Sequence, residues 1–118
     1  MYTTRYVDYE VVEYLKNRSE KEGKPVNWIV EDMLKNLTVE EAKNIKRTNH
    51  KAFGRLKLSP KNLETLNQIL IEVNKDRQRT DFIYMNDVLK FLVEKAKKEE
   101  EQKKKEQKKK EGIFSWFA

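Results

Sequence analysis

The feature that most constrains the fold is a pattern of capping and apolar residues that occurs twice along the chain. Counting from Asn27, apolar residues stand at +2, +3, +6, +7 and +10, and counting from Asn86 they stand at the same five offsets. Each Asn follows a segment that starts at a capping residue, Asp8 or Ser59, and both segments place apolar residues at −1, +4 and +7. Such a repeat predicts two copies of one supersecondary unit that bury their apolar faces together.

The start of each copy predicts a short strand. Residues 2–7 are rich in aromatic and β-branched side chains, which favour extended structure. In residues 53–58, two leucines alternate with an arginine and a lysine, which predicts a strand with one buried face. Each copy therefore begins with a strand and continues into the helical part of the pattern.

Recognisable residues mark the ends of the helices. Asp8 and Ser59 are expected to cap the first helix of each copy, because Asp and Ser side chains accept hydrogen bonds from free backbone N–H groups. Gly23 is expected to end the first of these helices. Asn27 and Asn86 are expected to cap the second helix of each copy. The sequence thus predicts two helices per copy.

The segments between and after the copies differ in character. Thr38 and Glu41 form a capping-box pattern, which predicts a short helix in the connector, through about Arg47. The tail has Glu-to-Lys pairs four residues apart, which support a helix weakly, so it is expected to be helical or disordered. The expected divisions are the first copy (1–37), the connector (38–52), the second copy (53–96), a Lys/Glu-rich tail (97–111) and an apolar terminal segment (112–118).

Composition narrows the possible functions. Hydrophobic residues make up 37% of the 118 residues and charged residues 39%, so a core would be thin and pairing of the two copies would enlarge it. With no cysteine and one histidine, His50, metal sites and histidine-based catalysis are not expected, and neither an enzyme nor a cofactor is predicted. No apolar run is long enough to span a bilayer, so we expect a soluble, cytoplasmic protein.

The charge favours a polyanionic partner, but only weakly. The formal net charge is +6. The segment 97–111 has eight Lys and five Glu, so it carries half of this charge and the remaining chain carries the other half. The interpretation as a nucleic-acid-binding protein therefore depends on local pattern rather than on total charge.

Two stretches carry a family resemblance. RYVDYEVVEYLKNRSEKEGKPVNWIVEDMLKNL resembles a ribbon-helix-helix motif, the family of the Arc and methionine repressors, and RLKLSPKNLETLNQIL with MNDVLKFLVEKA is similar to a second copy. Short basic tandem forms of this kind resemble regulators of archaeal viruses, which would act in the host cytoplasm. The resemblance implies a mostly α, α+β fold in which the two copies pair within the chain as an antiparallel two-stranded ribbon over four helices.

The resemblance also implies a site: the ribbon enters the major groove of double-stranded DNA and outward strand side chains read the bases. In the second strand, Arg55 and Lys57 face outward because the alternating leucines face the helices, and Phe53 shares their side. Arg and Lys can donate to guanine O6 and N7. These three residues are the candidate reading residues of the second strand.

The first strand leaves an alternative open. Alternation from the apolar residue before the cap places Thr4 and Tyr6 outward and Arg5 inward. An unpaired buried charge is costly, so either Arg5 reaches solvent at the strand edge or a bulge shifts the register. We expect Thr4 and Tyr6 to contact bases and keep Arg5 as a further candidate.

Phosphate contacts are expected at the starts of the second helices, where free N–H groups and the helix dipole favour an anion. The candidates are the backbone N–H groups that follow Asn27 and Asn86, with Lys24 nearby.

The main expectation is a transcriptional regulator, such as a repressor, that self-associates on DNA. The closest alternative is the antitoxin of a toxin–antitoxin pair, in which the tail ending in GIFSWFA binds the toxin. A third possibility is a protein that uses this end to contact another protein or a membrane surface.

Overall fold

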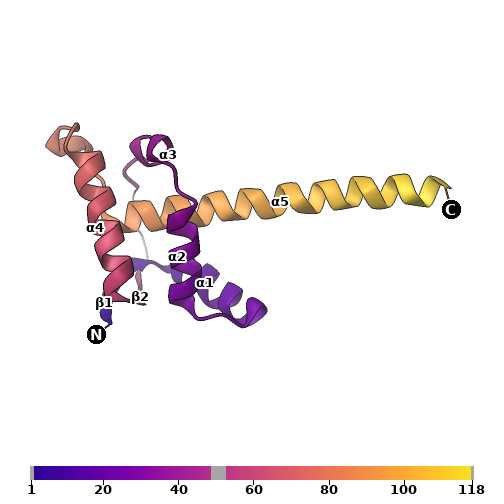
Figure 1. Ribbon diagram of the computed structural model, residues 1–118, viewed down its shortest axis with the longest axis horizontal. Helices are drawn as coiled ribbons and strands as arrows, with labels where there is room; N and C mark the ends of the chain where they lie inside the picture. Colours follow the sequence, from indigo (N-terminus) through magenta and orange to yellow (C-terminus); the bar gives the residue numbers. More distant parts are fainter. Residues whose placement is uncertain (1, 49–52, 118) are drawn as a thin grey trace.

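The fold is mostly helical, with one two-stranded antiparallel sheet among the described residues (Figure 1). The computed structural model describes residues 2–48 and 53–117, with side chains as far as residue 101. The sheet lies at one corner of the body, and the last helix crosses the body and extends beyond it (Figure 1). The elements are β1 (Thr3–Asp8), α1 (Tyr9–Glu22), α2 (Val26–Lys35), α3 (Val39–Lys43), β2 (Phe53–Leu58), α4 (Pro60–Asn74), the 3-10 turn η1 (Arg79–Asp81) and α5 (Met85–Phe117).

The two strands pair antiparallel within the chain, which confirms the expected two-stranded sheet. The register runs without interruption from the Thr3–Leu58 pair through all six residues of each strand. β2 has the predicted bounds, and β1 lies one residue later than predicted at both ends. Gly54 lets β2 approach α1 closely, because a Cβ at this position would stand 2.9 Å from Cγ2 of Val12.

The predicted boundaries of the first helices are confirmed. The Asp8 side chain accepts a hydrogen bond from the Glu10 backbone N–H at 3.0 Å, and Ser59 Oγ accepts one from the Asn62 N–H at 3.3 Å. Each bond satisfies one of the N–H groups that a helix start leaves without an intrahelical partner. Gly23 ends α1 with a φ of 66°, a left-handed conformation that glycine adopts at little cost.

The apolar positions of the repeated pattern form one shared core. Leu15 and Leu66, the +7 residues of the two copies, expose 1% and 0% of their surface. The +10 residues Leu37 and Ala96 are both half-buried against this core. The buried residues of the second helices are Ile29, Val30, Met33 and Leu34 in the first copy and their counterparts Val88, Leu89, Leu92 and Val93 in the second. The two copies therefore bury the same positions.

The predicted caps of the second helices are wrong. α2 begins at Val26, with Pro25 as its N-cap, and α5 begins at Met85, so Asn27 and Asn86 both lie within the first helical turn. Pro25 has a fixed φ that suits a helix start, and at α5 the Tyr84 backbone N–H donates to the Asp87 carboxylate at 2.7 Å. The two asparagine side chains are instead used to join the copies.

The connector and the loop before α5 each insert an isoleucine that the pattern does not identify. The capping box of Thr38 and Glu41 is present, but α3 ends at Lys43 rather than near Arg47, because the chain turns there to bury Ile45. In the longer loop of the second copy, the Asn74 side chain donates to the Ile83 carbonyl at 3.0 Å and accepts from its N–H at 2.9 Å. Both isoleucines are 1% exposed, so they fix their segments to the core.

The tail continues the last helix. α5 runs to Phe117, which agrees with the helical form expected for the tail. Its near part contacts α1, where Tyr14 Oη donates to Glu100 at 2.9 Å. The side chains of the apolar terminal segment 112–118 lie outside the described residues. Over the part of the chain that is described, no helix combines the length and the apolar character needed to cross a membrane.

Candidate nucleic-acid interface

The outer face of the sheet carries four exposed polar side chains, Thr4, Tyr6, Arg55 and Lys57. The register places Thr4 opposite Lys57 and Tyr6 opposite Arg55. Side chains alternate along a strand, so these pairs share the face that points away from the buried Leu56 and Leu58 side chains. All four predicted residues therefore lie together on one exposed face.

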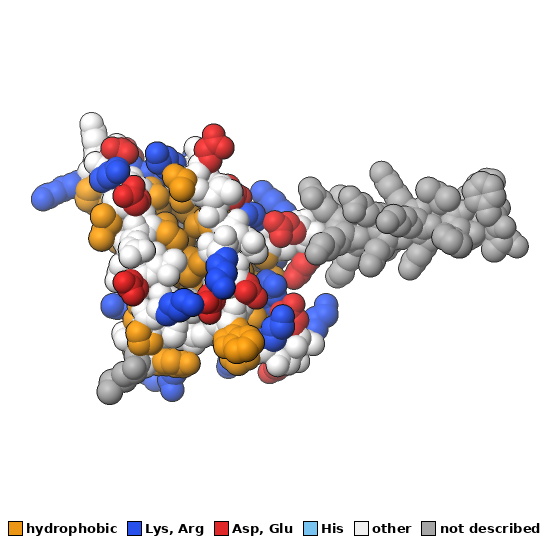
Figure 2. Space-filling view, viewed as in Figure 1, with side chains coloured by type: hydrophobic (Ala, Val, Ile, Leu, Met, Phe, Trp, Pro, Cys, Tyr) orange, Lys and Arg blue, Asp and Glu red, His pale blue; other side chains and the backbone are white. Residues whose placement is uncertain are grey.

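An aromatic side chain borders this face at one end. Phe53 pairs with Asp8 in the register and is 57% exposed, although it is a large apolar residue. Tyr6 on the face itself is 64% exposed. Hydrophobic side chains are visible at the surface along the lower edge of the molecule, the side on which the sheet lies (Figure 2). Exposed aromatic groups of this kind can contact thymine methyl groups or sugar rings.

Arg5 follows the first of its two predicted alternatives. The register contains no bulge, and Arg5 pairs with Leu56 on the inner side of the sheet. It is nevertheless exposed, although its partner Leu56 is buried. Arg5 is therefore separated from the outer face that carries the other strand candidates.

The register is symmetric with respect to the repeated pattern. The pattern makes Asp8 equivalent to Ser59, so Arg5 is equivalent to Leu56, and the register pairs these two residues with each other. By the same rule Thr4 is equivalent to Arg55 and Tyr6 to Lys57. The pair of Thr4 with Lys57 on one side of the centre is therefore equivalent to the pair of Arg55 with Tyr6 on the other side. Two equivalent strands therefore meet about a central pair, as two subunits would about a two-fold axis.

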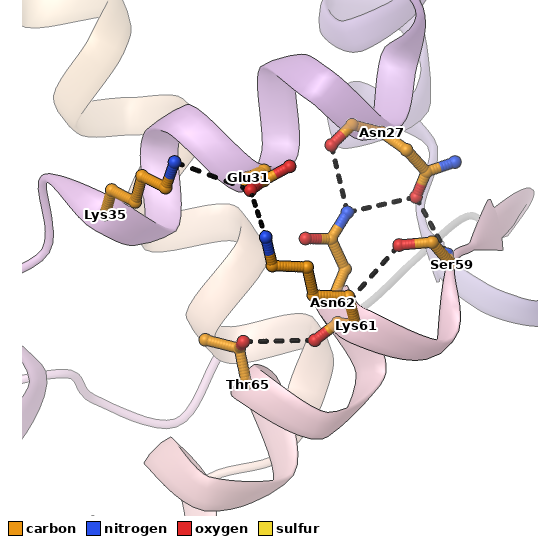
Figure 3. Close-up of polar contacts among 7 residues, drawn as sticks. All are labelled: Asn27, Glu31, Lys35, Ser59, Lys61, Asn62 and Thr65. Carbon is orange, nitrogen blue, oxygen red and sulfur yellow. Dashed lines mark hydrogen bonds and ion pairs between the residues drawn. The ribbon is translucent and has the colours of Figure 1, made fainter.

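Asn27 joins the start of α2 to the end of β2 and to α4 (Figure 3). Its side-chain amide donates to the Lys57 carbonyl at 3.1 Å, and its Oδ1 accepts from the Ser59 N–H at 2.9 Å. The Asn62 amide, which is 2% exposed, donates to the Asn27 carbonyl and to Asn27 Oδ1 at 3.0 and 3.1 Å. These bonds hold the start of α2 beside the strand that carries Lys57.

An ion pair supports the same junction (Figure 3). Lys61 Nζ lies 2.7 Å from the Glu31 carboxylate, and Lys35 lies 3.5 Å from it. The hydrogen bond from Lys61 lowers the pKa of Glu31 below its ordinary value, and the positive charge of Lys61 adds to this effect. The pair links α2 to α4 on the exposed surface, where such pairs contribute little to stability.

Asn86 makes the equivalent connection in the second copy. Its Oδ1 accepts from the Asp8 N–H at 2.7 Å, as Asn27 Oδ1 accepts from the Ser59 N–H. Each copy thus contributes an asparagine that binds the capping residue of the other copy. Sequence reasoning identified both asparagines but assigned them local capping, because a single-chain pattern does not show which distant backbone group a side chain meets.

The starts of α2 and α5 flank the sheet at opposite ends and differ in their chemistry. Within the described residues, the backbone N–H groups of Val26 and Asn27 donate no hydrogen bond, α2 has no acidic residue in its first turn, and Lys24 is exposed beside it. At α5, the carboxylate of Asp87 occupies the first turn and is 1% exposed. An anion is therefore favoured at the start of α2 and opposed at the start of α5.

Comparisons with known proteins found no protein-family model, no curated protein and no solved structure that matches this chain. Among the residues described, no group of three or more His, Cys, Asp or Glu side chains is arranged to hold a metal ion.

Proposed function

We propose that this protein is a sequence-specific, double-stranded DNA-binding transcriptional regulator that reads the major groove with its two-stranded sheet. The observation that carries this proposal is the outer face, where Arg55, Lys57, Thr4 and Tyr6 lie together, exposed to a partner. A two-stranded ribbon fits the width of the major groove, and Arg and Lys match the acceptors of guanine. No cofactor and no catalytic step are part of this function.

The symmetric register supports a tandem ribbon-helix-helix form, with the two copies acting as the two halves of a dimer within one chain. The Arg5–Leu56 pair at the centre and the crossed bonds of Asn27 and Asn86 are what such pairing of copies requires. The start of α2 then binds a backbone phosphate at the flank of the groove through its free N–H groups, with Lys24 beside it. That the protein is a regulator of an archaeal virus, as the sequence resemblance implies, stays a prediction.

The first experiment is selection of bound sequences from a random DNA pool, followed by affinity measurements on the selected site. Arg55→Ala combined with Lys57→Ala is expected to lower specific affinity by about 1–3 kcal/mol per residue, because neither alanine can donate to a base. Folding is expected to be unchanged, since both side chains are exposed. The matched control replaces two exposed lysines of α1, Lys16 and Lys21, with alanine. Equal affinities for the two double variants would contradict the proposed reading face.

Self-association on DNA is a second part of the proposal. The chain has an apolar terminal segment at 112–118, at the far end of a helix that extends beyond the body (Figure 1). A chain cut after Glu101, which keeps the contact of Tyr14 with Glu100, is expected to retain sequence preference but to bind neighbouring sites without cooperativity. Footprints that lengthen equally with and without residues 102–118 would rule out this role for the tail.

A further inference from the structure

A basic cleft of about 530 Å³ lies between the connector and the loop that joins α4 to α5. Its charged lining residues are Lys43, Lys46, Arg47, Arg77 and Asp81. None of the four cations has a carboxylate partner among the described residues. A concave surface with an excess of unpaired positive charge raises the local concentration of anions.

The two walls of this basic cleft are held in place. The Arg77 guanidinium donates to the backbone carbonyls of Lys43 on one wall and Asp81 on the other. Ile45 anchors the connector wall in the core, and Ile83 anchors the loop wall. The cleft is therefore formed before any ligand arrives, so binding an anion would cost little ordering of the backbone.

The basic cleft adjoins the start of α5. Arg47 lies over the Tyr84 ring, 5.4 Å from its centre, and Tyr84 directly precedes α5. Thr48 binds the Asp87 carboxylate through its N–H at 2.9 Å and its hydroxyl at 2.7 Å. Asn86, in the same turn, binds Asp8, so the start of α5 lies between the cleft and the end of the sheet at which β1 meets α1.

The first copy has no counterpart of this cleft among the described residues. The walls of the cleft come from the connector and from the longer loop of the second copy, and the turn between α1 and α2 is short, with Lys24 as its cation. Segments 43–47 and 75–82 together hold six Lys and Arg residues against two Asp. Lys and Arg side chains project over the end of α4 at the upper left, with carboxylates among them (Figure 2).

We infer that the basic cleft binds the sugar-phosphate backbone of the DNA duplex beyond the end of the sheet, on the α5 side. This rests on the proposed function. Phosphodiester oxygens accept hydrogen bonds from guanidinium and ammonium groups, and such contacts add affinity without sequence information. On this flank the cleft takes the place of the helix start, where the Asp87 carboxylate opposes an anion. The protein thus binds the two flanks of its DNA site by different means: the start of α2 binds one flank, and the basic cleft beside α5 binds the other.

The test compares two triple variants of the full chain that change the same charge. The cleft variant is Lys43→Gln, Lys46→Gln and Arg47→Gln, which leaves the structural Arg77 in place. The control variant replaces three exposed cations that belong to α1 and α5, namely Lys16→Gln, Lys21→Gln and Lys98→Gln. Affinity for the selected duplex is measured over a range of salt concentrations, and hydroxyl-radical footprints record the protected backbone on both flanks.

The cleft variant is expected to keep the wild-type order of preference among DNA sequences. The slope of log affinity against log salt is expected to fall by about 0.9 for each phosphate that the variant no longer neutralises, and protection should disappear on one flank only. The control is expected to match the wild type. Equal slopes for the two variants would show that the cleft does not bind the DNA backbone, while leaving the proposed function intact. A wild-type chain that binds no DNA would overturn both proposals.

A titration with inorganic triphosphate in the absence of DNA is expected to show only weak binding. Tight binding that the cleft variant abolishes would instead show that the cleft is a site for small anions.

Discussion

The two halves of the chain bury the same apolar positions of the repeated pattern but expose different chemistry. Leu15 and Leu66 occupy the same place in the repeated pattern and are both fully buried. On the outer face of the sheet, by contrast, Thr4 corresponds to Arg55, a neutral hydroxyl to a cation. Shared burial constrains a residue through packing on all sides, whereas an exposed residue is constrained only by its partner. The halves therefore share a core, while their outer strand residues differ in charge.

The starts of α2 and α5 also share their structural contacts and differ in their exposed surfaces. Asn27 and Asn86 make equivalent bonds to the opposite copy. Yet the start of α2 is open to an anion, while that of α5 contains the buried Asp87 and adjoins the basic cleft. The two halves therefore share the asparagine contacts that join them and differ at their exposed flanks.

The largest effect is expected in the core. Leu15→Ala and Leu66→Ala are each expected to lower the free energy of unfolding by about 2–5 kcal/mol, because both remove a fully buried side chain. Since the core is shared, each variant should still unfold in one transition, which urea titration followed by circular dichroism would measure. Two separate transitions, or a destabilisation confined to one half, would show that the copies are independent domains.

The crossed asparagine bonds are the next test. Asn27→Ala and Asn86→Ala are each expected to lower the free energy of unfolding by about 1–3 kcal/mol, because the N–H groups of Ser59 and Asp8 lose their partners. The Asn27 side chain also binds Lys57 and Asn62, so Asn27→Ala removes these bonds as well. Urea titration measures both. If Asn86→Ala alone were neutral, the equivalence of the two junctions would be broken.

On the outer face, substitutions at equivalent positions of the two halves are expected to have different effects on DNA binding. Arg55→Ala is expected to lower specific binding by about 1–3 kcal/mol, because alanine cannot donate to guanine. Thr4→Ala, at the equivalent position, should cost about 0.5–1.5 kcal/mol because it removes a neutral hydrogen bond. Repeating the sequence selection with each variant should relax preference at different positions of one asymmetric site. A palindromic site, relaxed equally at both ends by either variant, would contradict reading by a single chain.

The smallest expected effect concerns an exposed ion pair at a position where the two halves carry opposite charges. Glu31 in α2 binds Lys61, whereas its equivalent in α5 is Lys90, which lies 3.4 Å from the Asp8 carboxylate. Because the pKa of Glu31 is lowered in the folded protein, its contribution to stability is present above the ordinary pKa of Glu and is lost as the pH falls through the lowered value. Glu31→Gln should remove this part of the acid sensitivity. Parallel unfolding titrations at neutral and acid pH would measure it, and an identical pH dependence in wild type and variant would show that the pair contributes nothing.

Local pattern was sufficient for the strands, the first helices and the outer face. Arg55 and Lys57 were placed outward because leucines alternate with them, and period-two alternation fixes a face without knowledge of the partner strand. Ser59 and Gly23 were identified because their chemistry acts on their own helix ends. Each of these inferences needs only residues that are near in sequence.

Features that depend on contacts between residues distant in sequence were predicted wrongly or not at all. Ile45 and Ile83 are buried outside the repeated pattern, and no local signal marked them as core residues. The basic cleft joins two distant segments through the bond from Arg77 to the Lys43 carbonyl, a separation of 34 residues. Neither segment alone is more than a solvated stretch of charge, so the cleft could not be predicted from either.

The sequence by itself determined that one apolar pattern occurs twice, which residues of this pattern face inward, and that Arg55 and Lys57 are exposed on the outer face of the sheet. These follow from periodicity, which is a property of neighbouring residues. Only the tertiary structure decided that equivalent residues Arg5 and Leu56 pair with each other, and that Asn27 and Asn86 bind across the copies. Such contacts depend on how two elements meet in space, and the asparagine partners lie 32 and 78 residues away, where no local pattern specifies them.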